Sequence, residues 1–482
     1  MLDLRPVFFV IGILLTTLAL AMVLPAVADA SVGNPDWQVF LAAAGLTLFV
    51  GGALILTMRT DDMALSIRQA FILTTMSWLA IALFGSLPFV FAELELSFTD
   101  AFFESMSGVT TTGSTVIVGL DRAPPGILLW RALLQWLGGV GIIVMAMAVL
   151  PMLQVGGMQL FRMESSDRSE KVLPRATQIA SGIGAVYLAV TSVCAFFYWL
   201  FGMTGFEAVA HAMTTIATGG FSTSDASFGR FDSAAIDWTA VLFMIVGSLP
   251  FVLYLQALRG KPSGLIRDGQ VKVFLAITAI LVALVAWGYA SASGAALGHA
   301  VRMAAFNAVS IMTGTGYVTA RFEEWGAFAA PVFFLAMFIG GCAGSTTCGI
   351  KIFRFQVLYA TAVTQMRQLL QPHGVFIAYY NRRPIPEEVA VSVMSFVFLY
   401  VLCFAVLAAL LGALGLDFLT AVSGAATAIS NVGPGLGPTI GPAGNFSSLP
   451  DTAKWALSAG MLLGRLELFT VLVLFAPAFW RD

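Results

Sequence analysis

Ten long apolar segments constrain the fold of this chain more than any other feature of its sequence. Each approaches the roughly 20 apolar residues that a helix needs to cross a hydrocarbon core. Only 10% of the 482 residues are charged, against about 25% in soluble domains, so too few charges are present to form a polar shell. We therefore expect an all-α integral membrane protein with ten transmembrane helices, near residues 7–28, 38–57, 69–92, 127–150, 179–202, 235–258, 271–290, 326–350, 388–411 and 455–479.

The first segment has some features of a secretory signal, with Arg5 before the apolar run and Ala28-Asp29-Ala30 near its end. The run is longer than the roughly 7–15 residues of a signal's apolar core, so we predict a retained helix. If all ten segments span, 17 of the 24 Lys and Arg residues fall on one side. Basic connections stay in the cytoplasm, so both termini are predicted to be cytoplasmic.

The four long connections on the opposite side resemble one another. Aligned without gaps so that each ends on a glycine, they read TDAFFESMSGVTTTG (99–113), FEAVAHAMTTIATGG (206–220), RMAAFNAVSIMTGTG (302–316) and LTAVSGAATAISNVG (419–433). Alanine is third in every window, which supports the register independently of the glycines that set it. Irregular backbone at membrane depth is tolerated only beside protein or water, so we expect re-entrant loops that line a cavity.

This repeat divides the chain into similar units. The four glycines are separated by 107, 96 and 117 residues, and each interval holds an outgoing span, a basic link, an incoming span and the next loop. We predict four pseudo-fourfold helix–pore loop–helix repeats around a central pore, preceded by two extra helices. The units are residues 1–60 (the two extra helices), 61–160 (repeat 1, loop to Gly113), 161–265 (repeat 2, to Gly220), 266–375 (repeat 3, to Gly316) and 376–482 (repeat 4, to Gly433).

The ends of the loops have the chemistry of a potassium filter. A potassium ion that enters a narrow pore exchanges its water for rings of backbone carbonyls. Glycine allows the necessary backbone turn because it reaches positive φ without a Cβ clash. The helix before each glycine directs the negative end of its dipole at the ion. We predict potassium binding, without a covalent cofactor, at Thr111, Thr112, Gly113, Thr218, Gly219, Gly220, Gly314, Thr315, Gly316, Asn431, Val432 and Gly433.

Other interpretations remain at this point. Thr-Gly pairs are common in loops, so the windows could be packing loops of another transporter, although four copies in register disfavour this. A proton- or sodium-coupled transporter needs ionisable residues buried in its spans, where only Arg465 is evident. A membrane enzyme needs a nucleophile, a metal or an acid–base pair at membrane depth, which the spans do not show. The net charge of −2 gives no indication of a nucleic-acid partner.

Several motifs taken together resemble a known family. They are Thr110-Thr111-Thr112-Gly113-Ser114, Ala217-Thr218-Gly219-Gly220-Phe221-Ser222-Thr223, Gly314-Thr315-Gly316-Tyr317, Gly340-Gly341-Cys342-Ala343-Gly344-Ser345-Thr346-Thr347, Ser430-Asn431-Val432-Gly433-Pro434-Gly435 and Gly464-Arg465-Leu466-Glu467. Over essentially its whole length the chain resembles the TrkH subunits of bacterial potassium uptake systems, in the Trk/Ktr/HKT superfamily. The resemblance implies potassium uptake across the bacterial inner membrane, with a cation-coupled potassium symporter as the alternative.

The same resemblance implies partners and a selectivity rule. It implies a homodimer of pore subunits on a separate cytosolic nucleotide-binding ring of the TrkA type. Sodium-preferring plant relatives carry serine in place of the first filter glycine, so Gly113 favours potassium. Gly314 departs from the family pattern, because many relatives carry threonine there.

Two features of the later segments suggest a gate. Four glycines within residues 340–349 should break the helix that starts at 328–339, because each costs about 1 kcal/mol relative to alanine, and residues 351–370 then form a basic amphipathic helix. The loop either obstructs the pore or packs closely through small residues. Arg465 is either a functional group or a structural partner of a carboxylate or of carbonyls. The resemblance implies an intramembrane gate of Gly340, Gly341, Gly344, Ser345, Thr346 and Gly349, with Arg465 holding it closed.

Glu104, His211 and Asn307 occupy the same position in the first three windows. They either form hydrogen bonds behind the filter or are ordinary polar residues at loop interfaces.

Overall fold

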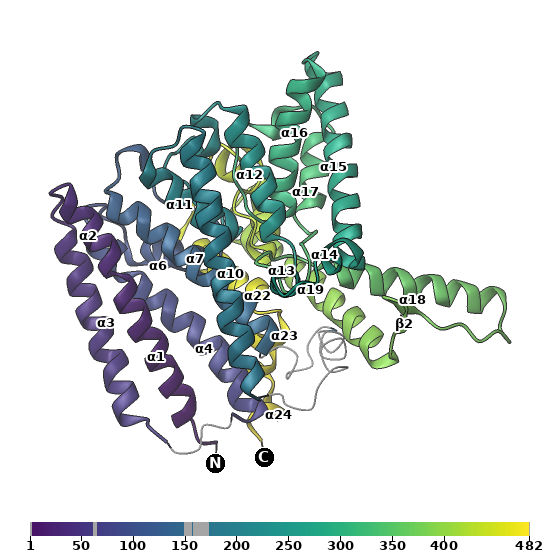
Figure 1. Ribbon diagram of the computed structural model, residues 1–482, viewed down its shortest axis with the longest axis horizontal. Helices are drawn as coiled ribbons and strands as arrows, with labels where there is room; N and C mark the ends of the chain where they lie inside the picture. The colour runs from purple at the N-terminus through teal and green to yellow at the C-terminus, as the bar shows by residue number, and fades with distance from the viewer. Residues whose placement is uncertain (1, 61–64, 149–156, 158–172, 482) are drawn as a thin grey trace.

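The computed structural model describes residues 2–60, 65–148, 157 and 173–481. They form a bundle of helices with both ends of the chain on the same side (Figure 1). Seven of the described helices are long and apolar enough to cross a membrane, and two bent pairs raise the number to nine. Large apolar side chains such as Phe49, Leu56, Trp287 and Phe398 are exposed on the outer faces, as expected where lipid is the solvent.

Three helices precede the repeats: α1 (Arg5–Ala21), α2 (Val23–Ser31) and α3 (Trp37–Thr57). Helices α1 and α3 pack together, and α1 also contacts the first repeat. A Cβ added to Gly12 would lie 2.8 Å from the Gly51 carbonyl oxygen, and one on Gly51 would lie 2.9 Å from that of Gly12. Small residues therefore allow close backbone approach between these two membrane helices.

The repeats follow in chain order. Repeat 1 contains α4 (Ile67–Gly85), α5 (Leu87–Phe91), α6 (Phe98–Val109), η1 (Leu120–Arg122) and α7 (Pro125–Ala148), and repeat 2 contains α10 (Leu173–Leu200), α11 (Gly205–Ile216), η2 (Ser227–Arg230), α12 (Ala234–Gly247) and α13 (Phe251–Leu258). After α14 (Ser263–Arg267), repeat 3 contains α15 (Gly269–Ser293), α16 (Leu297–Met312), η3 (Phe322–Glu324), α17 (Ala329–Ala336) and α18 (Ile352–Leu370). Strands β1 (Tyr379–Tyr380) and β2 (Arg383–Pro384) then lead to repeat 4, with α19 (Glu387–Ala413), α20 (Phe418–Ser430), α21 (Gly437–Ile440), α22 (Asp451–Arg465), α23 (Phe469–Leu472), η4 (Val473–Phe475) and α24 (Pro477–Trp480).

The repeats close into a ring. Each outgoing helix packs on the short helix that follows it, as α4 on α6, α10 on α11, α15 on α16 and α19 on α20. Neighbouring repeats meet through α7 and α11 and through α12 and α16. The last repeat returns to the first, because α22 packs against α6. This arrangement confirms the predicted ring of helix–pore loop–helix repeats.

Three incoming spans are broken. The break within 326–350 was predicted from its glycines and is confirmed, whereas the bends within 235–258 and 455–479 correct the continuous segments predicted there. Helices α12 and α13 meet at 91°, and α22 meets the following segment at 109°. Pro250 stands at the first break, and proline cannot continue a helix without losing a hydrogen bond. At the other bend, Glu467 and Leu468 have φ of 64° and 50°, outside the helical region. Helix α17 ends at Ala336, before the glycine-rich segment and short of the predicted 328–339.

One glycine in each of three incoming helices touches the backbone of the preceding short helix. A Cβ on Gly138, Gly247 or Gly464 would lie 1.9, 3.0 or 2.1 Å from a carbonyl oxygen. The oxygen belongs in each case to the eleventh residue of the aligned window, namely Val109, Ile216 or Ile429. The three glycines are therefore equivalent points of the repeat.

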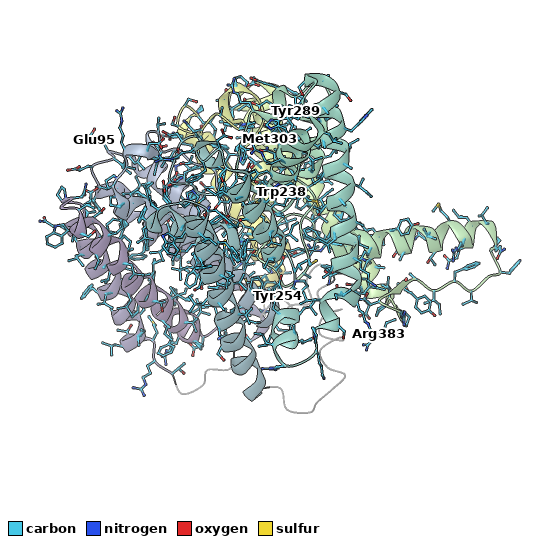
Figure 2. The ribbon with its side chains drawn as sticks, turned by 45° about the horizontal axis from the view of Figure 1, so that its top comes forward. Glu95, Trp238, Tyr254, Tyr289, Met303 and Arg383 are labelled. Atoms are coloured by element: carbon cyan, nitrogen blue, oxygen red, sulfur yellow. The ribbon has the colours of Figure 1, made fainter. Side chains whose placement is uncertain are left out.

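Helix α18 and the β1–β2 hairpin form an arm that projects from the bundle (Figure 1). The bounds of α18 confirm the helix predicted at 351–370. Apolar residues on the arm are exposed, among them Leu369, Leu370 and Val375. Arg383 lies on the arm's side of the molecule and Glu95 on the opposite side (Figure 2).

Some predicted features lie outside the described residues. They are the basic residues Arg162, Arg168 and Lys171, the end of the segment predicted at 127–150, and the unit boundaries at residues 61 and 160–161.

Replacement of Gly138 by alanine tests the close approach between α7 and α6. The added methyl would overlap the Val109 carbonyl, and such overpacking costs about 1–3 kcal/mol. We expect a lower thermal unfolding midpoint for the detergent-purified Gly138→Ala protein. Gly52→Ala is the control, because a Cβ at Gly52 meets open space. Equal midpoints for wild type and Gly138→Ala would contradict the close approach.

Candidate functional site

Three of the four short helices begin with a side-chain cap. Ser97 accepts a hydrogen bond from the Asp100 amide, Thr204 from that of Glu207, and Asp417 from that of Thr420. Hydrogen bonding from Thr420 lowers the pKa of the Asp417 carboxyl. These caps satisfy free amides at the helix start and fix where each helix begins.

The residues after the four short helices share one backbone conformation. The thirteenth residue of each window has positive φ: 53° at Thr111, 50° at Thr218, 72° at Gly314 and 52° at Asn431. The fifteenth also has positive φ: 88° at Gly113, 77° at Gly220, 80° at Gly316 and 110° at Gly433. We call residues 111–113, 218–220, 314–316 and 431–433 the filter loops. Gly314 thus adopts the same conformation as its threonine and asparagine counterparts.

One backbone hydrogen bond recurs in all four filter loops. The amide of the fourteenth window residue donates to the carbonyl of the ninth, at 2.9 Å in the first three loops and 3.0 Å in the fourth. The donors are Thr112, Gly219, Thr315 and Val432, and the acceptors are Ser107, Thr214, Ser310 and Thr427. The bond ties each filter loop to its own helix at membrane depth, where an unpaired amide would be costly.

The filter loops contact one another in a closed cycle. A Cβ on Gly113 would lie 2.3 Å from the Gly219 carbonyl oxygen, and one on Gly220 would lie 1.8 Å from that of Thr315. A Cβ on Gly316 would lie 2.0 Å from the Val432 oxygen, and one on Gly433 would lie 2.9 Å from that of Thr112. The fifteenth residue of each loop therefore faces the fourteenth carbonyl of the next, in the order 1, 2, 3, 4 and back to 1. All four glycines also border one cavity of about 300 Å³.

The fourth loop differs in its side chains. The Asn431 amide nitrogen donates to the Thr112 hydroxyl and to the Met461 carbonyl, both at 2.9 Å. The side chain thereby joins the fourth loop to the first and to α22. Asparagine accepts the left-handed conformation more readily than most residues, so the divergent Asn431-Val432-Gly433 sequence fits the common backbone.

Polar residues behind the filter anchor the chain that leaves it. Glu104 accepts a hydrogen bond from the Val116 amide at 2.9 Å, and Asn307 accepts one from the Thr319 amide at 3.2 Å. His211 Nε2 lies 3.0 Å from the Ser222 hydroxyl. The structure thus agrees with hydrogen bonding behind the filter rather than with ordinary interface polarity. In the fourth repeat the neighbouring Ser423 takes this part, by accepting from the Leu436 amide at 3.0 Å.

Arg131 on α7 is a further member of this network. Its Nε lies 2.7 Å from Glu104 Oε1, and both side chains are buried. Its Nη1 donates to the Ser222 carbonyl at 2.7 Å, and its guanidinium lies 4.0 Å from the centre of the Phe221 ring. Arg131 thereby links the first short helix to the chain that follows the second filter loop.

The segment 340–349, which we call the gate loop, lies directly against the second filter loop. The Thr346 hydroxyl oxygen lies 3.0 and 2.9 Å from the Ile216 and Gly247 carbonyl oxygens, which share its one proton, and it accepts from the Thr218 hydroxyl at 3.2 Å. The Thr346 amide donates to the Gly247 carbonyl at 3.2 Å, and the Cys342 amide donates to that of Ser248 at 3.0 Å. The break between α12 and α13 thus supplies the carbonyls that hold the gate loop.

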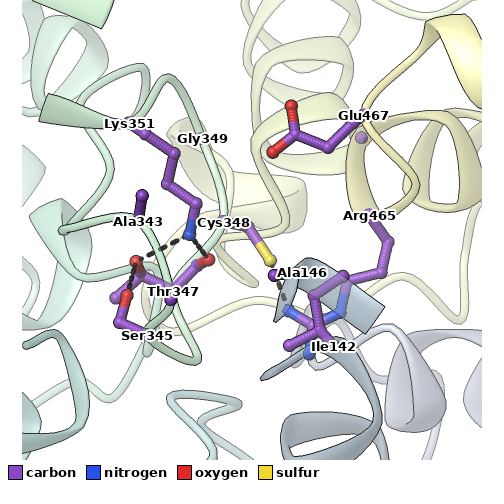
Figure 3. Close-up of a pocket in the computed structure, with 12 residues that line it drawn as sticks. Ile142, Ala146, Ala343, Ser345, Thr347, Cys348, Gly349, Lys351, Arg465 and Glu467 are labelled. Carbon is purple, nitrogen blue, oxygen red and sulfur yellow. Dashed lines mark hydrogen bonds between the residues drawn. The ribbon is translucent and has the colours of Figure 1, made fainter. Parts of the chain in front are cut away.

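Arg465 holds the gate loop from the opposite side. Its Nη1 lies 3.1 Å from the Thr346 carbonyl oxygen and 2.6 Å from Cys348 Sγ, and its Nη2 lies 2.9 Å from the Gly138 carbonyl oxygen. Lys351 donates to the Thr347 carbonyl at the end of the loop. Figure 3 shows Arg465 directed at Cys348 and Lys351 directed at Thr347 around one cavity. Arg465 lies at the last residue of α22 rather than in mid-helix.

Arg465 is not the one buried ionisable residue of the predicted spans, because Arg131 in segment 127–150 and Glu467 in segment 455–479 are buried too. Glu104, Arg354 and Lys454 are buried outside those segments. Arg354 pairs with Glu467, and Lys454 lies 2.6 Å from Asp100. The sequence offers no signal for these two pairs, because the partners lie on different repeats.

Removal of the Glu104 carboxylate tests the buried pair behind the filter. In Glu104→Ala the Arg131 charge stays buried without its partner, which costs about 3–5 kcal/mol, so we expect a clearly lower unfolding midpoint. Glu324→Ala is the control, because its pair with Arg321 is exposed and such pairs contribute about 0–1 kcal/mol. Similar midpoints for the two variants would show that the buried pair does not stabilise this region.

Comparison with known proteins identifies the family. The sequence model of the TrkH family, described as a cation transport protein, matches residues 36–482. The chain is 46% identical over 481 residues to the Trk system potassium uptake protein TrkI of Halomonas elongata, covering 99% of this chain and 97% of that protein. It is 37% identical over 485 residues to the Trk system potassium uptake protein TrkH of Escherichia coli K12, covering 99% of each. The crystal structure of the potassium transporter TrkH from Vibrio parahaemolyticus matches with a TM-score of 0.92 at 36% identity, over 100% of both chains. The chain therefore belongs to the TrkH family of cation transport proteins.

Proposed function

We propose that this protein takes up potassium through a filter lined by the backbone carbonyls of residues 111–113, 218–220, 314–316 and 431–433. The observation that carries the proposal is the closed cycle in which each filter glycine faces a carbonyl of the next loop. The names of the relatives, which are potassium uptake proteins and a potassium transporter, support the same ion.

The chemistry of the loops favours a cation with a readily shed hydration shell. The four filter loops contain no carboxylate, so selection falls to carbonyl and hydroxyl oxygens. The Thr111 hydroxyl is buried and finds no hydrogen-bond partner among the described residues, which leaves it available to an ion. The C-terminal ends of α6, α11, α16 and α20 add their dipoles.

The gate loop is proposed to close this pathway beneath the filter. Its Thr346 hydroxyl bonds to the Thr218 hydroxyl of the second filter loop, and Arg465 donates to its backbone. Glycines at residues 340, 341, 344 and 349 give the loop backbone freedom, and two of them, Gly344 and Gly349, have positive φ of 77° and 69°. Displacement of the loop would open the lower end of the pathway.

Fixed ion pairs favour a pore over an ion-coupled carrier. Arg131 with Glu104, Arg354 with Glu467 and Lys454 with Asp100 each hold a buried charge against a partner of opposite sign. A coupled carrier needs buried groups that exchange partners between two states. We therefore prefer a gated pore to the cation-coupled symporter.

The partners and location follow from the family resemblance and remain part of the proposal. We place the protein in the bacterial inner membrane as a homodimer with cytoplasmic termini, regulated by a cytosolic nucleotide-binding ring of the TrkA type. Both ends of the chain lie on one side of the molecule (Figure 1), in keeping with that orientation. The exposed apolar residues of the α18 arm offer a surface to either partner.

Replacement of Gly113 by serine tests the filter. A Cβ at this position would meet the Gly219 carbonyl, so the first two loops must separate and the oxygen cage must change shape. We expect the wild-type protein to rescue a potassium-uptake-deficient strain at low potassium when its regulator is present. We expect Gly113→Ser to lower the K⁺/Na⁺ preference about tenfold, which corresponds to about 1.4 kcal/mol. An unchanged K⁺/Na⁺ preference in Gly113→Ser would contradict the assignment of these residues to the filter. Failure of the wild type to rescue the strain would contradict potassium uptake as the function.

Replacement of Arg465 by alanine tests the gate. The variant loses the bonds to Thr346, Cys348 and Gly138, so the gate loop is held less firmly. We expect faster ⁸⁶Rb⁺ influx into proteoliposomes than for the wild type without its regulator. Arg321→Ala, which changes an exposed arginine, should leave influx as it is. Slower or equal influx for Arg465→Ala at matched protein amounts would contradict a gate held by this residue.

A further inference from the structure

The second filter loop lacks the side-chain support that the others have at the fourteenth window position. That position is Thr112, Gly219, Thr315 and Val432 in loops 1 to 4. In loop 1 the Thr110 and Thr112 hydroxyls are hydrogen-bonded at 2.7 Å, and in loop 3 those of Thr313 and Thr315 at 2.8 Å. Loop 4 carries β-branched Val432. Loop 2 has the tandem Gly219-Gly220, two adjacent residues whose backbone no side chain restricts.

A residue of repeat 1 supplies support to this tandem from outside. Gln135 on α7 is fully buried. Its Nε2 donates to the Gly219 carbonyl at 2.5 Å, and its Oε1 accepts from the Phe221 amide at 3.0 Å. A carbonyl can only accept and a backbone amide can only donate, so the two contacts fix the orientation of the side-chain amide. Gln135 thus bonds to the backbone on both sides of Gly220, to the Gly219 carbonyl before it and to the Phe221 amide after it.

The absence of a side chain at residue 219 is a consequence of this contact. A Cβ on Gly219 would lie 2.4 Å from Gln135 Cδ and 2.5 Å from its Oε1. The φ of Gly219 is not positive, so the backbone conformation does not itself demand glycine there. Gln135 occupies the space that the threonine or valine side chain fills in the other loops.

The equivalent positions in two other repeats are apolar. Gly138, Gly247 and Gly464 are equivalent points of the incoming helices, and the residues three positions earlier are Gln135, Met244 and Met461. Methionine cannot donate a hydrogen bond to a filter carbonyl. Gln135 therefore makes the boundary between loops 1 and 2 chemically distinct from the boundaries next to Met244 and Met461.

The carbonyl that Gln135 holds also belongs to the closed cycle of the filter. The Gly219 oxygen is the group that would lie 2.3 Å from a Cβ on Gly113. We propose that Gln135 is a positioning residue that sets ion preference, by fixing the Gly219 carbonyl against Gly113 in the one filter loop that has glycine at the fourteenth window position. The proposal rests on the proposed function of the filter. Without the amide, the carbonyl can turn and approach a smaller ion more closely, so the filter should reject sodium less well.

Two substitutions separate the roles of the amide group. Gln135→Met installs the residue of the equivalent positions 244 and 461 and removes both hydrogen bonds. Gln135→Glu keeps the size of the side chain and the acceptor for the Phe221 amide, but it replaces the donor to Gly219 by an oxygen. We expect both variants to lower the K⁺/Na⁺ preference about fivefold, the factor that matches one typical hydrogen bond. We expect the larger change from the glutamate variant at a pH where its carboxyl is ionised, because two oxygens then face each other, whereas a protonated carboxyl would still donate to the Gly219 carbonyl.

The experiment measures K⁺ and Na⁺ influx into proteoliposomes at matched amounts of folded protein. Wild type, Gly113→Ser, both Gln135 variants and Met244→Leu are compared, the last as a control that alters the equivalent position without a hydrogen bond. A fall in total influx with an unchanged K⁺/Na⁺ ratio would mean that Gln135 only stabilises the fold, and it would overturn the proposal. If Gln135→Met does not fold, Gln135→Glu decides by the same ratio.

A second measurement distinguishes this inference from the filter assignment and covers the case in which neither variant folds. If Gly113→Ser changes the ratio and the Gln135 variants do not, the filter stands and the positioning role fails. If Gly113→Ser also leaves the ratio unchanged, the filter assignment fails and this inference fails with it.

Independently, Gly219→Ala should lose most potassium influx, and the double variant Gly219→Ala with Gln135→Ala should recover part of it because the overlap is gone. No recovery would overturn the proposed contact between the two residues.

Discussion

The contact of each filter glycine with the fourteenth carbonyl of the next loop is the constraint on which the rest of this structure depends. The contact leaves no room for a Cβ at Gly113, Gly220 or Gly316, and the positive φ of all four glycines disfavours one independently. Because the cycle closes from loop 4 to loop 1, no loop can move outward alone without opening two contacts. Four helix pairs of unequal sequence are thus held to one geometry at the axis.

That geometry places irregular backbone at membrane depth, and the surrounding polar groups follow from this need. Each loop repeats the bond from the fourteenth amide to the ninth carbonyl, while the departing chain is anchored differently in every repeat: by Glu104, by His211, by Asn307 and by Ser423. The backbone is therefore nearly fourfold, while the side chains that support it are not. Evolution of four repeats within one chain allows such differences, whereas four identical subunits would not.

The sequence predicted the glycine positions, the re-entrant loops and the ring, because local spacing and a pattern repeated four times indicate all three. The polar residues of the first three windows were also visible as equivalents. The bend at Leu466-Glu467-Leu468 was not, since these three residues include no proline or glycine and the turn depends on tertiary contacts such as that of Glu467 with Arg354. Arg131 and Gln135 were missed for a related reason. They lie four residues apart on an apolar helix, and their partners in loop 2 are about 90 residues away. The spacing of Arg131 and Gln135, which places two polar residues on one face of an apolar span, was the signal that could have identified them.

The contact between Arg465 and the gate loop is of a strength that the binding of a ligand can outweigh. Arg465 donates a charged hydrogen bond to the Thr346 carbonyl of the gate loop, which favours the closed loop by about 1.5–3 kcal/mol, while its bond to the Gly138 carbonyl attaches the arginine to α7. A ligand that shifts a two-state equilibrium from 1:99 to 99:1 must prefer one state by about 5.5 kcal/mol. The Arg465 bond is weaker than that preference, so a ligand of this selectivity would outweigh it. Lys351, which donates to Thr347 at one end of the loop, immediately precedes α18. Movement of the exposed α18 arm would therefore displace the gate loop through Lys351. The same movement would reach the bend beside Arg465 through the ion pair of Arg354, on the arm, with Glu467.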